Sequence, residues 1–593
     1  MGASSSMEQP VSAEQRELEN IAASTGALPL LQKSFSNLSD PQTNAISVQT
    51  LQQCFHLCYE DPVCESQQKP ESFPRLLDHL GSSIVDLFFL SEKGGINWLG
   101  FLGGYVKCCG RMSTSMSLNI LLRIFAMAVK KLGLSSNLEF EPDDADCKIN
   151  GSLLPSDLLL LLWMCWAMLW NVRTLKSSER KGNLLLPDIN HLVLSAVVAC
   201  AEVDSSFDLW NCDIVGLDVQ LPVGKFLNWA ITTAPTLSDC LTQYVNRRLQ
   251  ISVLAEDEEG SSESISGDMS PNASQALLLT RGRAWAISLA PRSTITEEIL
   301  KLCFSADIVG TDENLLYRFV ISPLMSSTHG KGLNRFWSNV EGYHGPLLVL
   351  ISANSEDAYQ DNNKARKWII GALTQQGFEN KDTFYGSLGN LYAISPIFHV
   401  FSPSGACGRG QGTCIEDVRI HSLPGLCNQV SVGPFSFSVD DLVNIINHKI
   451  LTGKEKNYVY SHLHPTGRVY ESHPKPVGIA FGGTTTNERI FIDEDFAKLT
   501  VRHHAMDKTY QPGSLIPNQG FLPVEASISE VEVWGLGGKT AKEVQDSYKK
   551  REELFTEQRR KVDLKTFATW DDSPEKMMMD MMGDPNRVQR EDR

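Results

Sequence analysis

The sequence lacks the features of a nucleic-acid-binding, secreted or membrane-spanning protein. Acidic residues outnumber basic ones by 70 to 53, and the net charge of -17 argues against the basic face of a general nucleic-acid binder. The N-terminus has no apolar segment of the kind found in signal peptides. The longest apolar run, Leu158–Val172, is shorter than the roughly 20 residues that cross a bilayer, so we expect a buried core helix.

Cysteine pairs at the C-x-x-C spacing are also missing. The fourteen cysteines include two loose groups, which are Cys54, Cys58 and Cys64, and Cys407, Cys414 and Cys427. Neither group has the short C-x-x-C spacing of a structural zinc site, although His421 is a candidate fourth ligand for the second group. We therefore expect no metal and no cofactor, and we interpret the cysteines as reduced thiols, several of them in cores.

An acidic stretch around Asp146 resembles part of a calcium-binding loop. Counted from Asp146, Asn150 and Gly151 occupy positions 5 and 6, and Asp157 falls at position 12. Position 3 is then Lys148, a cation where an oxygen ligand belongs. We prefer to interpret the stretch as an acidic connection between two helices, with calcium sensing as an alternative.

The first six residues match the pattern for N-myristoylation. Removal of Met1 exposes Gly2, and Ser6 stands at the position that the pattern requires. One myristoyl chain binds a membrane only weakly and reversibly. The glutamates that follow would be repelled by an anionic membrane surface. We therefore predict acylation of Gly2, with a protein partner as the second anchor; a free N-terminus is the alternative.

The pattern of apolar residues divides the chain into two halves. The first half has helical periodicity, and the second has short apolar runs between turns. After a flexible N-terminus of residues 1–44, apolar periodicity predicts helices over residues 45–254. Within this region Leu118–Leu132 is typical of an apolar helix. Residues 255–275 are acidic, rich in serine and poor in apolar residues, which predicts a disordered linker whose serines are candidates for phosphorylation.

Short apolar runs separated by Gly, Pro and Asn turns follow from Leu315 onward. Leu347–Ser352 and Trp368–Leu373 are typical of strands, and Val531–Trp534 alternates as a half-buried strand does. Short strands separated by turns predict an antiparallel sandwich. The expected fold class is α+β, with a helical N-terminal half, an antiparallel β-sandwich and a C-terminal helix.

The C-terminal segment 540–593 begins with a charged helix, expected over Thr540–Val562 with a capping box of Thr540 and Glu543. Four apolar or aromatic residues lie near one face at spacings of four and seven: Val544, Tyr548, Phe555 and Val562. Because this stripe is narrow and the opposite face is basic, the helix has little reason to pack fully on its own domain. We predict that these four residues bind a partner, in a groove or against a coiled-coil stalk; a solvated helix is the alternative.

Ordered sequence blocks between residues 290 and 538 resemble the TLDc domain. The blocks are Leu315–Arg318 with Ser327–Gly330, Gly345–Leu350 with Ile370–Ala372, Phe384–Gly386 with Leu391–Pro396, and Gly478–Gly483 with Ile490–Phe496 and Val531–Gly535. Residues 402–456 form an insertion, with a helix expected at Val439–Ile450. Gly2 and the helical half are also similar to the lysosome- or vacuole-associated branch, in which a degenerate EF-hand-like region precedes the TLDc domain.

The resemblance implies a non-enzymatic interaction protein in the cytoplasm, peripheral to lysosomal or vacuolar membranes. Such a protein would bind and modulate the vacuolar-type proton ATPase and act in nutrient or oxidative-stress signalling. The alternative is an enzyme of oxidative-stress defence that uses His or Cys groups of the TLDc domain. Five histidines are near one another in the sequence: His462, His464, His473, His503 and His504. No Cys or Glu stands at a matching metal spacing, so we interpret them as surface or turn residues and expect no catalytic residue.

Overall fold

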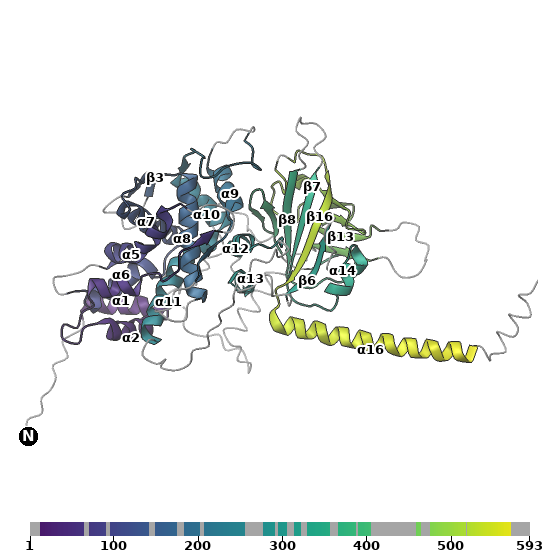
Figure 1. Ribbon diagram of the computed structural model, residues 1–593, viewed down its shortest axis with the longest axis horizontal. Helices are drawn as coiled ribbons and strands as arrows, with labels where there is room; N and C mark the ends of the chain where they lie inside the picture. Colours follow the sequence, from purple (N-terminus) through teal and green to yellow (C-terminus); the bar gives the residue numbers. More distant parts are fainter. Residues whose placement is uncertain are drawn as a thin grey trace, which may run out of the picture.

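The computed structural model contains a helical half, a β-sandwich beside it and a long terminal helix, α16 (Gly538–Trp570). Two further helices, α12 (Arg281–Leu289) and α13 (Thr294–Phe304), lie between the halves, and α16 runs away from the helical half (Figure 1). The structure describes residues 12–64, 70–89, 95–140, 149–174, 183–201, 207–254, 277–290, 294–304, 314–321, 329–355, 366–386, 389–404, 458–463, 475–517 and 519–570. Gly2, the predicted linker 255–275 and most of the predicted insertion 402–456, including the expected helix Val439–Ile450, lie outside these residues.

Side-chain caps open several helices of the first half. The helices are α1 (Ala13–Ser24), α2 (Leu28–Leu38), α3 (Val48–Cys54), α4 (Ser72–Asp78), α5 (Leu80–Phe88), α6 (Trp98–Cys109), α7 (Thr114–Lys131), α8 (Pro155–Thr174), α9 (Asn190–Cys200), α10 (Val223–Thr233), the 3-10 helix η1 (Pro235–Asp239) and α11 (Cys240–Leu254). Ser113 accepts the N–H of Met116 and thereby caps α7. The helix predicted at Leu118–Leu132 is confirmed, and this cap places its start four residues earlier.

The apolar helix α8 lies in the core of the helical half. Its residues from Leu158 to Asn171 are all buried. Because apolar residues surround α8 instead of forming one stripe, it is suited to a position enclosed by other helices. α8 is long and apolar enough to cross a membrane. However, 83% of its apolar segment is buried inside the protein. The predicted buried core helix is confirmed, and it extends over Pro155–Thr174.

Helix–loop–helix units in this half are joined in pairs through their loops. The α2–α3 loop meets the α5–α6 loop at an antiparallel bridge between Ile46 and Ile96. In the same way β3 (Ile149–Leu153), between α7 and α8, pairs with β5 (Leu221–Pro222), between α9 and α10. Two further short pairings are β1 (Val63–Cys64) with β4 (Leu185–Leu186), and β2 (Leu138–Phe140) with β3.

The described part of the connection between α7 and α8 contains a glycine with a positive φ. Counted from Asp146, Gly151 is the sixth residue, and its φ of 101° is the left-handed conformation that glycine adopts readily. The twelfth residue, Asp157, uses its carboxylate to accept the N–H of Leu154 at 3.2 Å. Asp146 and Lys148 lie outside the described residues, so calcium binding stays a prediction.

The second half is an antiparallel sandwich, as predicted. Its strands are β6 (Leu315–Val320), β7 (Leu347–Ser355), β8 (Arg366–Thr374), β9 (Lys381–Tyr385), β10 (Leu391–Ser395), β11 (His399–Phe401), β12 (Val459–His462), β13 (Gly478–Thr484), β14 (Asn487–Asp493), β15 (Lys498–Val501) and β16 (Val524–Gly535), with α14 (Leu333–Val340) and the short η2 (His504–Met506). The strand order is β11-β10-β8-β7-β16-β15-β14-β13-β12-β9. The first residues of β16 pair with β15, and the rest lies between β7 and β6, so this strand belongs to both layers.

The strands β7 and β8 are buried on both faces. Val349 and Ile351 belong to the core of the sandwich, whereas Leu348 and Leu350 belong to the apolar core that the helical half builds. Because both faces are covered, β7 is a continuous apolar run without the alternation of a half-solvated strand. The helical half therefore covers one face of the sandwich.

A buried carboxylate on β16 joins the two halves. Glu532 is 0% exposed, and its two oxygens accept the N–H groups of Leu278 at 2.8 Å and Leu279 at 3.0 Å, immediately before α12. The indole N–H of Trp534 donates to the same carboxylate at 3.0 Å, and Arg318 Nε lies 3.5 Å from it. Burial raises the pKa of Glu532, and the donated hydrogen bonds act in the opposite direction. The start of α12 is thus held by the sandwich.

A buried histidine lies at a second point of the same junction. The carbonyl of His191, on α9, accepts the N–H of Phe398 at 3.0 Å, and the two rings meet edge to face at 6.2 Å. His191 is 8% exposed, and within the described part of the chain its Nε2 has no hydrogen-bond partner. Burial, and then the charge of Arg283, lower the pKa of His191 to about 3. The imidazole is therefore neutral at neutral pH.

Candidate partner-binding surface

The helix α16 begins directly after the last strand of the sandwich. The N–H of Gly537 donates to the hydroxyl of Tyr343 at 2.7 Å. A Cβ atom on Gly345 would lie 2.8 Å from the Cα of Gly537, so this approach of two backbones requires glycine. These contacts start the helix at Gly538, and the predicted capping box beginning at Thr540 is therefore wrong.

Residues 538–549, which we call the root of α16, pack on the sandwich. Ala541 packs against the sandwich core. Gln545 is 0% exposed, and its Nε2 donates to the carbonyl oxygens of Asn339 at 2.8 Å and Glu341 at 3.2 Å. These carbonyls lie at the end of α14, where the helix leaves acceptors without partners of its own. The root is therefore held by specific polar contacts.

Tyr548 belongs to the root, although the sequence predicts a partner-binding role. Its ring covers Gly342, where a Cβ atom would collide with it. Its hydroxyl donates to the carboxylate of Glu341 at 2.9 Å. Burial, followed by this hydrogen bond, raises the pKa of Tyr548 to about 12. The next residue, Lys549, donates to the carbonyl of Asn339 at 3.2 Å.

Residues 550–570, which we call the arm of α16, extend past the sandwich (Figure 1). Every side chain from Lys550 to Val562 is exposed. Phe555 is 59% exposed and Val562 is 60% exposed, and their spacing of seven residues places them on one face of the helix. Val544 is 44% exposed, although it lies one turn before Tyr548 on the same face of the helix. Of the four predicted residues, these three are exposed.

The chain matches a known domain over the sandwich and part of the helices beside it. Residues 296–409 and 435–537 match the TLDc domain. The C-terminal region carries a TLDc domain. The match ends at the point where α16 begins, so the root and the arm follow the TLDc domain. No curated protein matches the chain.

The apolar residues of the arm form an exposed strip beyond the TLDc domain. Burying one such side chain in a partner contributes roughly 1.5–3 kcal/mol. The heptad spacing of Tyr548, Phe555 and Val562 suits packing along another long helix. Tyr548 already contacts Glu341 of the sandwich. The surface available to a partner therefore begins after Tyr548, on the arm.

The structure describes three of the five histidines that the sequence groups together. The rings of His503 and His504 are 3.9 Å apart, whereas His462 is the last residue of β12. His464 and His473 lie outside the described residues. Among the residues that the structure describes, no three His, Cys, Asp or Glu side chains converge as metal ligands.

Sequence reasoning misses two parts of the exposed surface. Leu554, 58% exposed, lies about 100° around the helix from Phe555 and therefore outside the predicted stripe. Phe521 and Leu522 are 83% and 79% exposed in the loop before β16. Only their position between Gly520 and Pro523 could have indicated a turn, and no sequence signal indicates that both side chains face solvent.

Removing the buried amide of the root is expected to loosen α16. Gln545→Ala leaves the carbonyl of Glu341 without this donor and the carbonyl of Asn339 with Lys549 alone, which costs about 1–3 kcal/mol. Backbone amides of residues 538–549 should then exchange hydrogen faster by mass spectrometry. Gln558→Ala is the matched control, since Gln558 is exposed on the same helix. Equal exchange in both variants would contradict the role of Gln545.

Proposed function

We propose that the chain is a non-enzymatic interaction protein that binds and modulates the vacuolar-type proton ATPase through the arm of α16 and the TLDc domain. The observation that carries the proposal is the exposed pair Phe555 and Val562 on an arm whose root is fixed to the domain. A fixed root lowers the entropy lost when a partner binds the arm. The pump itself is suggested by resemblance to the lysosome- or vacuole-associated TLDc proteins.

The location that we propose is the cytoplasmic surface of endolysosomal or vacuolar membranes. A myristoyl group on Gly2 would add weak membrane affinity and raise the local concentration of the chain near a membrane-bound pump. The same resemblance suggests a role in nutrient or oxidative-stress signalling. A long helical stalk is the partner geometry that best suits the heptad spacing on the arm.

The arm is tested by affinity capture from cells, with pump subunits measured by quantitative mass spectrometry. The double variant Phe555→Ser with Val562→Ser should recover at least about tenfold less pump, because each burial contributes roughly 1.5–3 kcal/mol and about 1.4 kcal/mol is tenfold in affinity. Truncation after Lys549 keeps the root and should give the same loss. Leu554→Ser is the matched control, since Leu554 is equally exposed on another face of the helix.

The two parts of the proposal fail in different ways. Equal recovery with the double variant and with Leu554→Ser would move the contact from the arm to the TLDc domain. Absence of pump subunits from every sample, while an intact pump is recovered through one of its own subunits, would overturn the pump as partner. The α+β architecture and the TLDc domain are independent of either result.

A further inference from the structure

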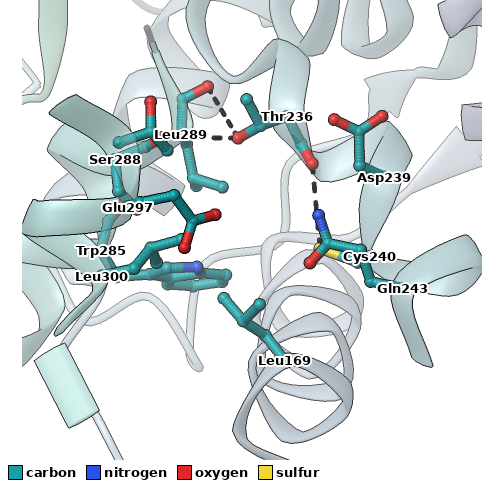
Figure 2. A pocket seen from close by; sticks show the side chains of 11 residues that line it. Leu169, Thr236, Asp239, Cys240, Gln243, Trp285, Ser288, Leu289, Glu297 and Leu300 are labelled. Atoms are coloured by element: carbon teal, nitrogen blue, oxygen red, sulfur yellow. Dashed lines mark hydrogen bonds between the residues drawn. The ribbon is translucent and has the colours of Figure 1, made fainter. Parts of the chain in front are cut away.

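A cavity of about 270 Å³ lies where the helical half meets α12 and α13 (Figure 2). Its apolar wall consists of Leu169, Trp285, Leu289 and Leu300. Figure 2 shows Cys240 and Gln243 on the side opposite Trp285 and Glu297. Gln243 is exposed, and the side chain of Glu297 is 52% exposed. These two residues form the rim of the cavity, where it is open to solvent.

The wall of this cavity contains a hydrogen-bond donor without an acceptor. Trp285 is 0% exposed, and its Nε1 has no partner among the described atoms. In Figure 2 the indole nitrogen lies on the ring edge that faces Glu297, whose carboxylate is already held by Arg173 at 2.6 and 2.8 Å. A buried N–H without an acceptor costs about 1–3 kcal/mol. A small molecule that brings an oxygen atom is therefore favoured here.

Two thiols meet beside the cavity. Cys240 lines it as the first residue of α11, and its thiol shares a hydrogen bond with that of Cys165, on the adjacent helix α8. The hydrogen bond with Cys240, together with burial, raises the pKa of Cys165 well above its usual range, so Cys165 stays protonated. Of the two buried cysteines, Cys240 lines the cavity and is 4% exposed, whereas Cys165 is 0% exposed.

We propose that Cys240 is oxidised by a small hydroperoxide that enters this cavity, and that Cys165 then forms a disulfide with it. The sulfur of Cys240 attacks one peroxide oxygen, the O–O bond breaks, and water leaves for hydrogen peroxide, which yields a sulfenic acid. The sulfur of Cys165 attacks the sulfur of Cys240, the S–O bond breaks, and a second water leaves with the thiol proton. Two thiols lose two electrons, and the peroxide gains them.

The disulfide would act on the junction between the two halves. Thr236, in η1 just before Cys240, donates through its hydroxyl to the carbonyl of Leu289 at 3.1 Å, at the end of α12. A disulfide shortens the distance between the sulfurs to about 2.05 Å. The start of α11 must then move toward α8, next to the contact that holds α12. Oxidation at the cavity is therefore expected to change the packing of α12.

The test is peptide mapping of the full chain after treatment with hydrogen peroxide under non-reducing conditions. We expect a Cys165–Cys240 disulfide that dithiothreitol reverses. Cys108 and Cys109 are the internal control, because both are buried and their sulfurs are 3.4 Å apart, but they do not line the cavity. In Cys165→Ala, dimedone should capture Cys240 as the sulfenic acid.

The route of entry is tested by a matched pair of surface variants. Gln243→Trp covers the rim and should slow oxidation of Cys240 several-fold, whereas Gln250→Trp, on an exposed position of the same helix, should not. The proposal is overturned by oxidation of Cys240 no faster than that of Cys109. Equal rates in the two tryptophan variants would also overturn it, because the peroxide then does not enter through the cavity.

Discussion

Replacing Glu532 with alanine is expected to lower the free energy of unfolding by about 3–5 kcal/mol, the cost of removing one partner from a buried charged cluster. The change leaves the N–H groups of Leu278 and Leu279 and the indole of Trp534 without their acceptor. It also removes the carboxylate beside Arg318. Urea unfolding monitored by tryptophan fluorescence measures the loss.

Glu525 provides the control for this prediction on the same strand. Its side chain is 68% exposed and lies 3.8 Å from Lys498, so Glu525→Ala should change stability by less than about 1 kcal/mol. Glu532→Gln keeps one oxygen acceptor and should fall between the two alanine variants. If Glu532→Ala is no less stable than Glu525→Ala, the carboxylate does not hold the halves together.

A variant without the imidazole of His191 is expected to lose less stability than the unmodified protein when the pH falls from 7 to 5. Folding depresses the pKa of His191 to about 3, so its stabilising contribution is complete above the unfolded value of roughly 6.5. Below that value the unfolded chain binds a proton that the folded chain excludes. Each pH unit then costs about 1.4 kcal/mol, which gives about 2 kcal/mol at pH 5.

The measurement is the free energy of unfolding at pH 7 and pH 5 for the unmodified protein and for His191→Gln. The difference between the two pH values should be smaller in the variant by about 2 kcal/mol. His344→Gln, at an exposed position of the sandwich, controls for the substitution itself and should keep the full difference. An identical pH dependence in all three proteins would show that His191 does not titrate in this way.

The helices and strands were predictable where one local pattern dominates. α7 follows from apolar periodicity, and β7 from a continuous apolar run between turns. The pairing of Ile46 with Ile96 was not predictable, because two residues joined across 50 positions leave no local signal. The contact of Glu532 with Leu278 and Leu279 is likewise long-range, and a glutamate in an alternating strand would be expected to face solvent.

The candidate site was predictable in part. Spacing alone identifies the face that carries Phe555 and Val562, because heptad periodicity is local. Spacing does not separate the root from the arm. Tyr548 belongs to the root because its ring packs on Gly342, which lies about two hundred residues away in the chain. The start of α16 was mispredicted for the same reason: the contact of Gly537 with Tyr343 overrides the local capping pattern.

The division of α16 into root and arm also sets the distance between the TLDc domain and a partner bound to the arm. The arm comprises residues 550–570, and at 1.5 Å per residue it is about 30 Å long. Because Gln545 and Tyr548 clamp the root, the direction of this spacer is set by the TLDc domain. A partner bound near Val562 is therefore held well away from the sandwich, which leaves the surface around Phe521 and Leu522 open to a second, simultaneous contact.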